Sequence, residues 1–175
     1  TDKRVNIVTK DLFTHYKTPQ DLANADVDEL SKEIYSCGFY RNKAKNLILM
    51  AKDLCQRFAG EVPNNYQDLV SLAGVGRKTA NVVLYVGFGV PAIAVDTHVF
   101  RVSNRLALVH AKTPLECELS LQKQVEKSSW GKFHHLLVLF GRYICSSRSP
   151  ACSDCEFKGK CPYFAQKKHE KVAKK

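Results

Sequence analysis

The apolar residues of this chain recur at spacings of three and four, the period of an amphipathic helix, and they almost never alternate as the residues of a strand do. Residues 43–58 show the pattern most fully, because Leu47, Met50, Ala51 and Leu54 fall on one helical face. The same spacing predicts further helices over residues 28–36, 65–72, 77–88, 97–106 and 132–144. We therefore expect an all-α fold with at least six helices and no strand.

The signals at the ends of these segments agree with helices. Pro63 and Asn64 are first-turn and cap candidates for the helix predicted from residue 65. Asp96 stands at the N-cap position of the helix predicted over residues 97–106. A change of composition after Leu108 places a seam within residues 90–115. We expect two domains, residues 1–90 and residues 91–175, the second ending in a solvated basic tail.

The charge of the chain points to a polyanionic partner. Lys and Arg number 27 against 17 Asp and Glu, which gives a formal charge of +10. Nucleic acid is the first candidate and an anionic membrane surface the second. The longest weakly polar stretch, Val82 to Val95, is broken by glycines and a proline and is shorter than the ~18 to 20 residues that span a bilayer.

Two glycines open the helix predicted over residues 77–88, in the stretch LAGVGRKTANVVL (residues 72–84). Gly74 and Gly76 can both adopt positive φ, so a tight turn of Gly74, Val75 and Gly76 can aim successive N–H groups at an anion before a helix N-terminus. Backbone donors recognise charge and not base identity, so such a turn would position a duplex without selecting a sequence. Taken alone, the Gly-Val-Gly triplet is more typical of a plain helix–helix turn, but Arg77, Lys78 and the net charge favour a phosphate.

Lys78 lies in the first turn of a helix whose residues are apolar nearly all round, which predicts that this helix is buried. Burial and the positive end of the helix both disfavour the charged amine, and a neutral amine is a nucleophile. A carboxylate such as Asp96 would favour the charged form, so the sequence does not fix the balance. A lysine that contacts phosphate and keeps its charge in solvent is the commoner use and stays open.

Four of the seven cysteines, Cys145, Cys152, Cys155 and Cys161, have the spacing C-x6-C-x2-C-x5-C, a poor pattern for a disulfide framework. Four thiolates within 17 residues can bind tetrahedral zinc or a [4Fe-4S] cluster. Structural zinc sites usually have two close pairs of ligands, whereas only Cys152 and Cys155 form one here, so the spacing favours the cubane. The loop also carries Arg148 and two lysines, which suits contact with DNA.

These three features together closely resemble the endonuclease III family of DNA glycosylases and AP lyases. The segments that carry the resemblance are LAGVGRKTANVVL, IAVDTHVFRVSNRL (residues 93–106) and the four-cysteine loop, and it runs from Thr1 to about Tyr163. It implies a helix-hairpin-helix glycosylase fold, in which a helical barrel domain that bears the hairpin lies beside an iron–sulfur domain. It also implies a monomer that binds damaged double-stranded DNA, and a cytoplasmic, nucleoid-associated bacterial protein.

Residue by residue, the resemblance makes Lys78 the nucleophile, Asp96 the catalytic carboxylate and the four cysteines the ligands of a [4Fe-4S] cluster. Phe39 falls where relatives place an apolar wedge that enters the base stack. The lesions expected from the family are oxidised pyrimidines. Asp96 can also act only as a helix cap, and we expect His98, His134 and His135 to be packing or hydrogen-bonding histidines.

The N-terminus departs from the family pattern. Relatives have a preceding helix and a run whose glutamine helps to fill the gap left by the extruded base, and Thr1 and Asp2 resemble the end of that run. If further residues precede Thr1 in the intact protein, we expect it to be active; if they do not, we expect an exposed apolar face and doubtful activity.

Two other functions stay open. The mismatch-adenine glycosylases share the hairpin, the aspartate and the cluster, but they resemble this chain less, because they lack a lysine at the position of Lys78. A non-catalytic DNA-binding module could use the same hairpin and basic loop.

Overall fold

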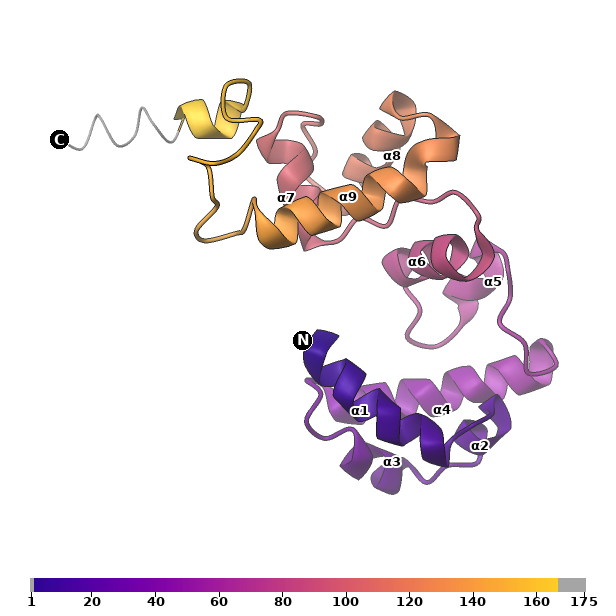
Figure 1. Ribbon diagram of the computed structural model, residues 1–175. Helices are drawn as coiled ribbons and strands as arrows, with labels where there is room; N and C mark the ends of the chain where they lie inside the picture. Colours follow the sequence, from indigo (N-terminus) through magenta and orange to yellow (C-terminus); the bar gives the residue numbers. More distant parts are fainter. Residues whose placement is uncertain (1, 167–175) are drawn as a thin grey trace. The chain divides into compact units, whose positions relative to one another are not determined.

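The computed structural model describes residues 2–166, and all of its regular elements are helical (Figure 1). The expectation of at least six helices without a strand is confirmed for these residues. The α-helices are α1 Asp2–His15, α2 Pro19–Ala23, α3 Val27–Glu33, α4 Tyr40–Arg57, α5 Tyr66–Ser71, α6 Arg77–Phe88, α7 Thr97–Arg105, α8 Pro114–Gln124 and α9 Trp130–Tyr143. A short 3-10 helix, η1, covers Lys127–Ser129, and residues 162–166 form one more helical turn.

Side-chain caps determine where several of these helices begin. Thr18 and Asp21 form a capping box at α2, and Asp26 caps α3. At α5 the cap is Asn65, whose side chain accepts a hydrogen bond from the backbone N–H of Asp68 at 3.0 Å. The cap prediction at Pro63 and Asn64 is therefore wrong by one residue, because only the side chain of Asn65 reaches the third N–H of the helix.

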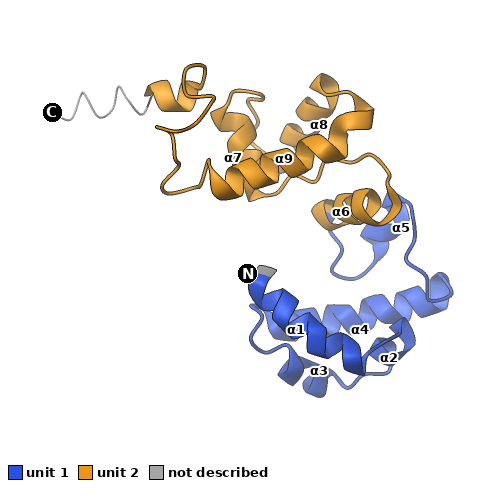
Figure 2. Cartoon of the chain, in the orientation of Figure 1, with its two compact units in different colours: residues 1–76 blue, residues 77–175 orange. Residues whose placement is uncertain are grey.

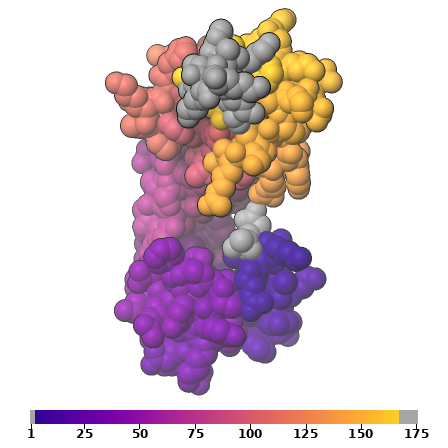
Figure 3. Space-filling view, turned by 90° about the vertical axis from the view of Figure 1, so that its left-hand side faces the viewer, coloured from indigo at the N-terminus to yellow at the C-terminus, as the bar shows by residue number. Residues whose placement is uncertain are grey.

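The chain divides into two compact units, Thr1–Gly76 and Arg77–Lys175 (Figure 2). In the first unit, α4 packs against α2 and α3. The residues of α1, drawn in indigo in Figure 3, lie against later residues of the same unit, which are drawn in purple. Its core contains Leu12, Leu22, Leu30, Ala44, Ile48 and Ala51. The domain boundary predicted between residues 90 and 91 stays a prediction.

In the second unit, α7 packs against α9 and α8. Its core contains Ile93, Val99, Val102, Cys117, Leu121 and Leu137. The core therefore holds the start of α7, where Asp96 lies, against the middle of α9. Nearly all of the predicted basic tail lies outside the described residues, as does Thr1. Among residues 2–166, none of the helices combines the length and the apolar character needed to cross a bilayer.

Candidate active site

The turn between α5 and α6 is tight, and it requires glycine at position 74. The N–H of Val75 donates to the carbonyl of Leu72 at 3.1 Å, and Gly74 has a φ of +77°. A Cβ atom at Gly74 would lie 3.0 Å from the Cβ of Asn46 on α4. Both the backbone angle and the close approach of α4 therefore exclude a side chain here.

Gly76 is used differently. It is exposed, its φ is not positive, and a Cβ atom there would meet nothing within 4 Å. Of the two glycines that can adopt positive φ, only Gly74 does so, and Gly74 alone makes the reversal. Within residues 2–166 no group accepts a hydrogen bond from the Gly76 N–H. Open space beside an unpaired backbone N–H at a helix start is the arrangement that an incoming anion needs.

Lys78 is the second residue of α6, and its side chain is exposed. The prediction that α6 is buried all round is wrong: Ala80, Asn81 and Leu84 are buried, but Val86 keeps 75% of its surface exposed. The helix is apolar on both faces, and among residues 2–166 only one face is covered. Protein burial therefore does not remove water from the amine of Lys78, and only a bound substrate can do so.

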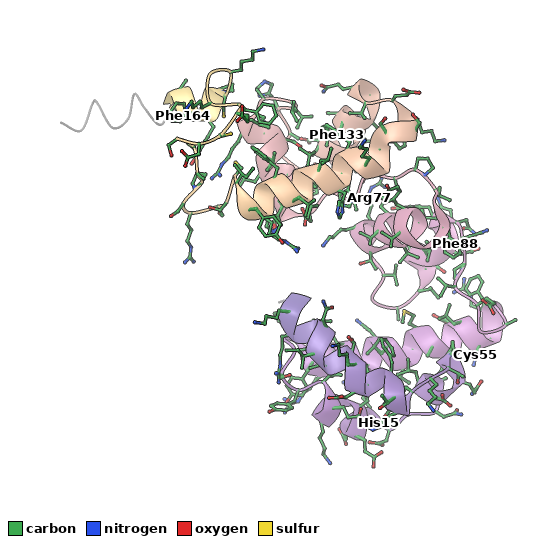
Figure 4. The ribbon with its side chains drawn as sticks, viewed as in Figure 1. His15, Cys55, Arg77, Phe88, Phe133 and Phe164 are labelled. Carbon is green, nitrogen blue, oxygen red and sulfur yellow. The ribbon has the colours of Figure 1, made fainter. Side chains whose placement is uncertain are left out.

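Arg77 begins α6 and binds a buried carboxylate on α8. Its Nε lies 2.7 Å from Oε2 of Glu118 and its Nη2 lies 2.8 Å from Oε1, a bidentate pair. Only 4% of the Glu118 side chain is exposed, against 43% of Arg77. Figure 4 shows Arg77 and Phe88 at opposite ends of α6. This guanidinium thus anchors the first turn of α6, and its predicted contact with DNA stays a prediction.

Asp96 caps α7, as the sequence predicts. Its Oδ1 accepts hydrogen bonds from the backbone N–H groups of His98 and Val99, both at 2.8 Å. The segment that leads to it is held from α6, because Nδ2 of the buried Asn81 donates to the carbonyl of Ile93 at 3.0 Å. In the described part of the chain, nothing donates to Oδ2 of Asp96. One oxygen therefore holds the helix start while the other is available to a ligand.

The buried His134 of α9 lies within electrostatic reach of both Lys78 and Asp96. Burial is the main cause that lowers the pKa of His134, and the charges of His135 and Lys78 lower it further. The carboxylate of Asp96 acts on the same imidazole in the opposite direction, raising its pKa. An amine and a carboxylate that both act on one imidazole form a site suited to nucleophilic and proton-transfer chemistry. The catalytic roles of Lys78 and Asp96 stay predictions.

The four cysteines of the C-terminal loop line one small hollow, and none of them is in a disulfide. Its other walls are mostly apolar and include Leu106, Phe140, Ile144, Tyr163 and Phe164. Among residues 2–166, no three metal-binding side chains gather closely enough to hold a single ion. Four thiols on the mostly apolar walls of one hollow are the donor set that an iron–sulfur cubane uses.

Two arginines of α7 fasten this loop to the helix that Asp96 caps. Arg105 donates to Sγ of Cys145 at 3.5 Å and to the carbonyl of Ser146 at 2.7 Å. Arg101 donates to the carbonyl of Cys145 and, at 3.2 Å, to Nδ1 of His98. The prediction that His98 is a hydrogen-bonding histidine is confirmed.

Phe39 and Arg148, the two remaining residues predicted to contact DNA, are both exposed. Phe39 precedes α4 at φ 58° and ψ 32°, a left-handed conformation that costs energy for a residue other than glycine. Its side chain is 85% exposed, so no packing within the chain explains this strained position. Arg148 lies in the cysteine loop.

Sequence reasoning missed Glu118. The burial of His134 agrees with the packing role predicted for it, whereas His135 is exposed. Glu118 is 41 residues from Arg77 and carries no local signal of a pairing. The sequence carries one signal that His134 is buried: it lies three residues from Gly131 and from Leu137, on the apolar face of α9.

Comparison with known proteins gives consistent matches. The family model of the HhH-GPD superfamily base excision DNA repair proteins matches residues 1–127. Endonuclease III of Bacillus subtilis is 51% identical over 162 residues, which are 92% of this chain and 74% of that protein.

Solved structures agree. A non-covalent complex of endonuclease III with DNA superposes with a TM-score of 0.94 at 45% identity, covering 97% of this chain and 79% of that one. A trapped covalent endonuclease III–DNA intermediate gives a TM-score of 0.93 at 46% identity, over 96% and 79% of the two chains.

Proposed function

The chain belongs to the endonuclease III family within the HhH-GPD superfamily of base excision repair proteins, bifunctional DNA glycosylases and AP lyases, and from this premise we propose that Lys78 and Asp96 carry its chemistry. The observation that supports this most is that the exposed amine of Lys78 and the half-buried carboxylate of Asp96 both act on the His134 imidazole. An exposed nucleophile is needed because its target, C1′ of the sugar, is brought by the substrate.

The reaction begins with a nucleotide that has left the base stack, since C1′ cannot be reached inside a duplex. The neutral amine of Lys78 attacks C1′ and the damaged base leaves. The C1′–O4′ bond of the sugar ring then opens, O4′ takes up one proton from the nitrogen, and a protonated Schiff base forms between Nζ and C1′. Loss of a proton from C2′ then expels the 3′ phosphate by β-elimination, which breaks the strand on the 3′ side. The free Oδ2 of Asp96 stabilises the positive charge that grows on the sugar as the base departs.

The hairpin residues Gly74 to Gly76 bind the DNA backbone through N–H groups, which is supported by the unpaired N–H and open space at Gly76. Phe39 is the wedge that replaces the extruded nucleotide in the stack, and its exposed, strained position supports this role. Arg77 and Arg148 add positive charge near the phosphates. The lesions removed are oxidised pyrimidines, as in the family, and a panel of duplexes with one defined lesion each tests this part.

The cofactor is a [4Fe-4S] cluster bound by Cys145, Cys152, Cys155 and Cys161, and the hollow that these thiols line supports it. When bound, the cluster ties the four thiols together and so fixes the fold of the basic loop. Absorbance near ~400 nm with iron and sulfide in equal amounts is the expected result. One zinc per chain without sulfide would contradict the cluster assignment and identify the site as a zinc site.

Borohydride trapping tests the function. The protein is mixed with a duplex that holds one abasic site, and the reductant converts the Schiff base into a stable covalent adduct. We expect the wild type and the exposed control Lys123→Gln to form the adduct, and Lys78→Gln to bind the duplex without forming it. Binding without any adduct in the wild type would mean a non-catalytic DNA-binding module. Base release only from adenine mispairs, without an adduct, would mean a mismatch-adenine glycosylase.

A further inference from the structure

His134 occupies an unusual position for an ionisable residue. It lies on α9 with 8% of its surface exposed, and within residues 2–166 no group forms a hydrogen bond with its imidazole. Buried polar side chains are nearly always hydrogen-bonded, so one without a partner calls for an explanation.

The face of α9 that bears His134 is packed against α6. Gly131 lies one turn earlier on the same face, and a Cβ atom there would lie 1.8 Å from Cε2 of Tyr85, so the tyrosine ring occupies the space of the missing side chain. Tyr85 belongs to α6, the helix whose first turn carries Lys78. Leu137, one turn later, enters the core with Val99 and Val102 of α7. His134 therefore lies between a contact with α6 and a contact with α7.

The imidazole is not sealed off. In the described part of the chain, only Ser103 Oγ is both closed to solvent and without a hydrogen-bond partner. Each ring nitrogen of His134, which also has no partner, therefore still reaches solvent. The charged and titratable groups that face it are Asp96 before α7, Lys78 on α6 and His135 on its own helix. Its unused nitrogens are thus open to water.

We propose that His134 is the proton relay of this site: it accepts, directly or through one water, the proton that the Lys78 ammonium must lose before its nitrogen attacks C1′. This step rests on the proposed role of Lys78 and adds the group that activates it. The lowered pKa of His134 fits the role, because an imidazole that is neutral at pH 7 can accept a proton.

The proton balance closes without any further reactant. The Lys78 ammonium gives one proton to His134, and the neutral amine adds to the aldehyde carbon C1′ of an abasic sugar. The resulting carbinolamine loses its hydroxyl group, which takes the proton back from His134 and leaves as water. The product is the protonated imine, with the single positive charge that the ammonium had, and His134 is neutral again.

The carboxylate is less suited to this first step. A carboxylate ordinarily holds a proton far less well than an imidazole does, and Oδ1 of Asp96 already accepts two backbone hydrogen bonds. Asp96 therefore stabilises positive charge, whereas His134 carries the proton.

The test compares His134→Asn with His135→Asn, which removes the neighbouring but exposed imidazole. The full chain with its cluster is mixed in excess with abasic duplex, and the single-turnover rate of borohydride trapping is measured from pH 5 to 9, with duplex affinity in parallel. We expect the wild-type rate to fall at low pH as His134 takes up a proton. His134→Asn should trap about a hundredfold more slowly at pH 7, with unchanged affinity and without the acid limb due to the imidazole. His135→Asn should resemble the wild type. A His134→Asn variant with the wild-type rate and pH profile would overturn the proposal.

A second measurement leaves His134 in place and so does not depend on how its variant folds. The pKa of the His134 imidazole is followed by NMR in protein with labelled histidine. Lys78→Met removes a charge that lowers this pKa and should raise it, whereas Asp96→Asn should lower it. No change in either variant would overturn the relay. If the wild type forms no adduct at all, the proposed lyase function fails; if only the His134 tests fail, the relay alone is lost.

Discussion

The ion pair between Arg77 and Glu118 should control both the stability of the second unit and the position of Lys78. In Arg77→Met, the Glu118 carboxylate, 4% exposed, loses its cation. Removing one partner of a buried pair costs about 3–5 kcal/mol. The cost is smaller here because 43% of the Arg77 side chain is exposed and Gln122 still donates to Oε1 of Glu118 at 3.2 Å. We expect a loss of about 2–3 kcal/mol, which for a chain of this size lowers Tm by about 5–10 °C.

The double variant Arg77→Met/Glu118→Leu separates the charge effect from packing. It removes both charges, so most of the lost stability should return. Arg57→Met is the matched control. Arg57 is exposed, donates to Ser71 Oγ at 2.9 Å and lies 4.8 Å from the centre of the Phe58 ring, so its removal should change stability by less than ~1 kcal/mol.

Thermal unfolding followed by circular dichroism measures the stability, and trapping of abasic duplex measures the effect on the site. Loosening the first turn of α6 displaces the attacking nitrogen, so Arg77→Met should trap at least tenfold more slowly. An unchanged Tm together with weaker DNA binding would refute this reasoning, and Arg77 would then serve as a phosphate contact. A double variant as unstable as the single one would also refute it.

Three further predictions concern the turn, the cap and the wedge. Gly74→Ala should lower the free energy of unfolding by about 1–3 kcal/mol, measured by thermal unfolding, because position 74 has a positive φ and Asn46 lies close to it. Gly76→Ala should leave Tm unchanged and weaken duplex affinity, measured by binding at several salt concentrations. Asp96→Asn keeps a good cap, so Tm should stay within about 2 °C while the single-turnover rate of base release falls by at least a hundredfold; equal rates would contradict the catalytic role. Phe39→Gly relieves the left-handed strain, so stability should rise by about 1 kcal/mol while binding to lesion-bearing duplex weakens; a loss of stability would show that Phe39 packs within the chain.

Much of the fold could be predicted from local signals. The helix over residues 77–88 and the cap at Asp96 were predicted as the structure has them, because each depends on neighbouring residues only. The short helix α2 was not predicted, since its five residues are too few to show a period, although Thr18, Pro19 and Asp21 spell a start signal. The helix α8 is also absent from the predicted helices, although Thr113 and Pro114 mark its first turn.

In the candidate site too, some features follow from local sequence signals and others depend on how the helices pack. The sequence indicates Lys78, Asp96 and the four cysteines through three separate motifs, each of which is a short continuous segment. Whether a helix face is covered depends on which other elements reach it, so the exposure of Lys78 could not follow from the apolar residues of α6. The same holds for His134, whose neighbours come from α6 and from the start of α7.

The central claim is that the amine of Lys78 becomes bonded to C1′ of the DNA sugar, and mapping the trapped adduct tests it most directly. The wild-type adduct with abasic duplex is reduced, the DNA and protein are digested, and the modified peptide is sequenced by mass spectrometry. We predict a single modified peptide in which trypsin has failed to cleave after residue 78, with the sugar remnant on Lys78. A remnant on any other lysine, or on the N-terminal amine, would contradict the account.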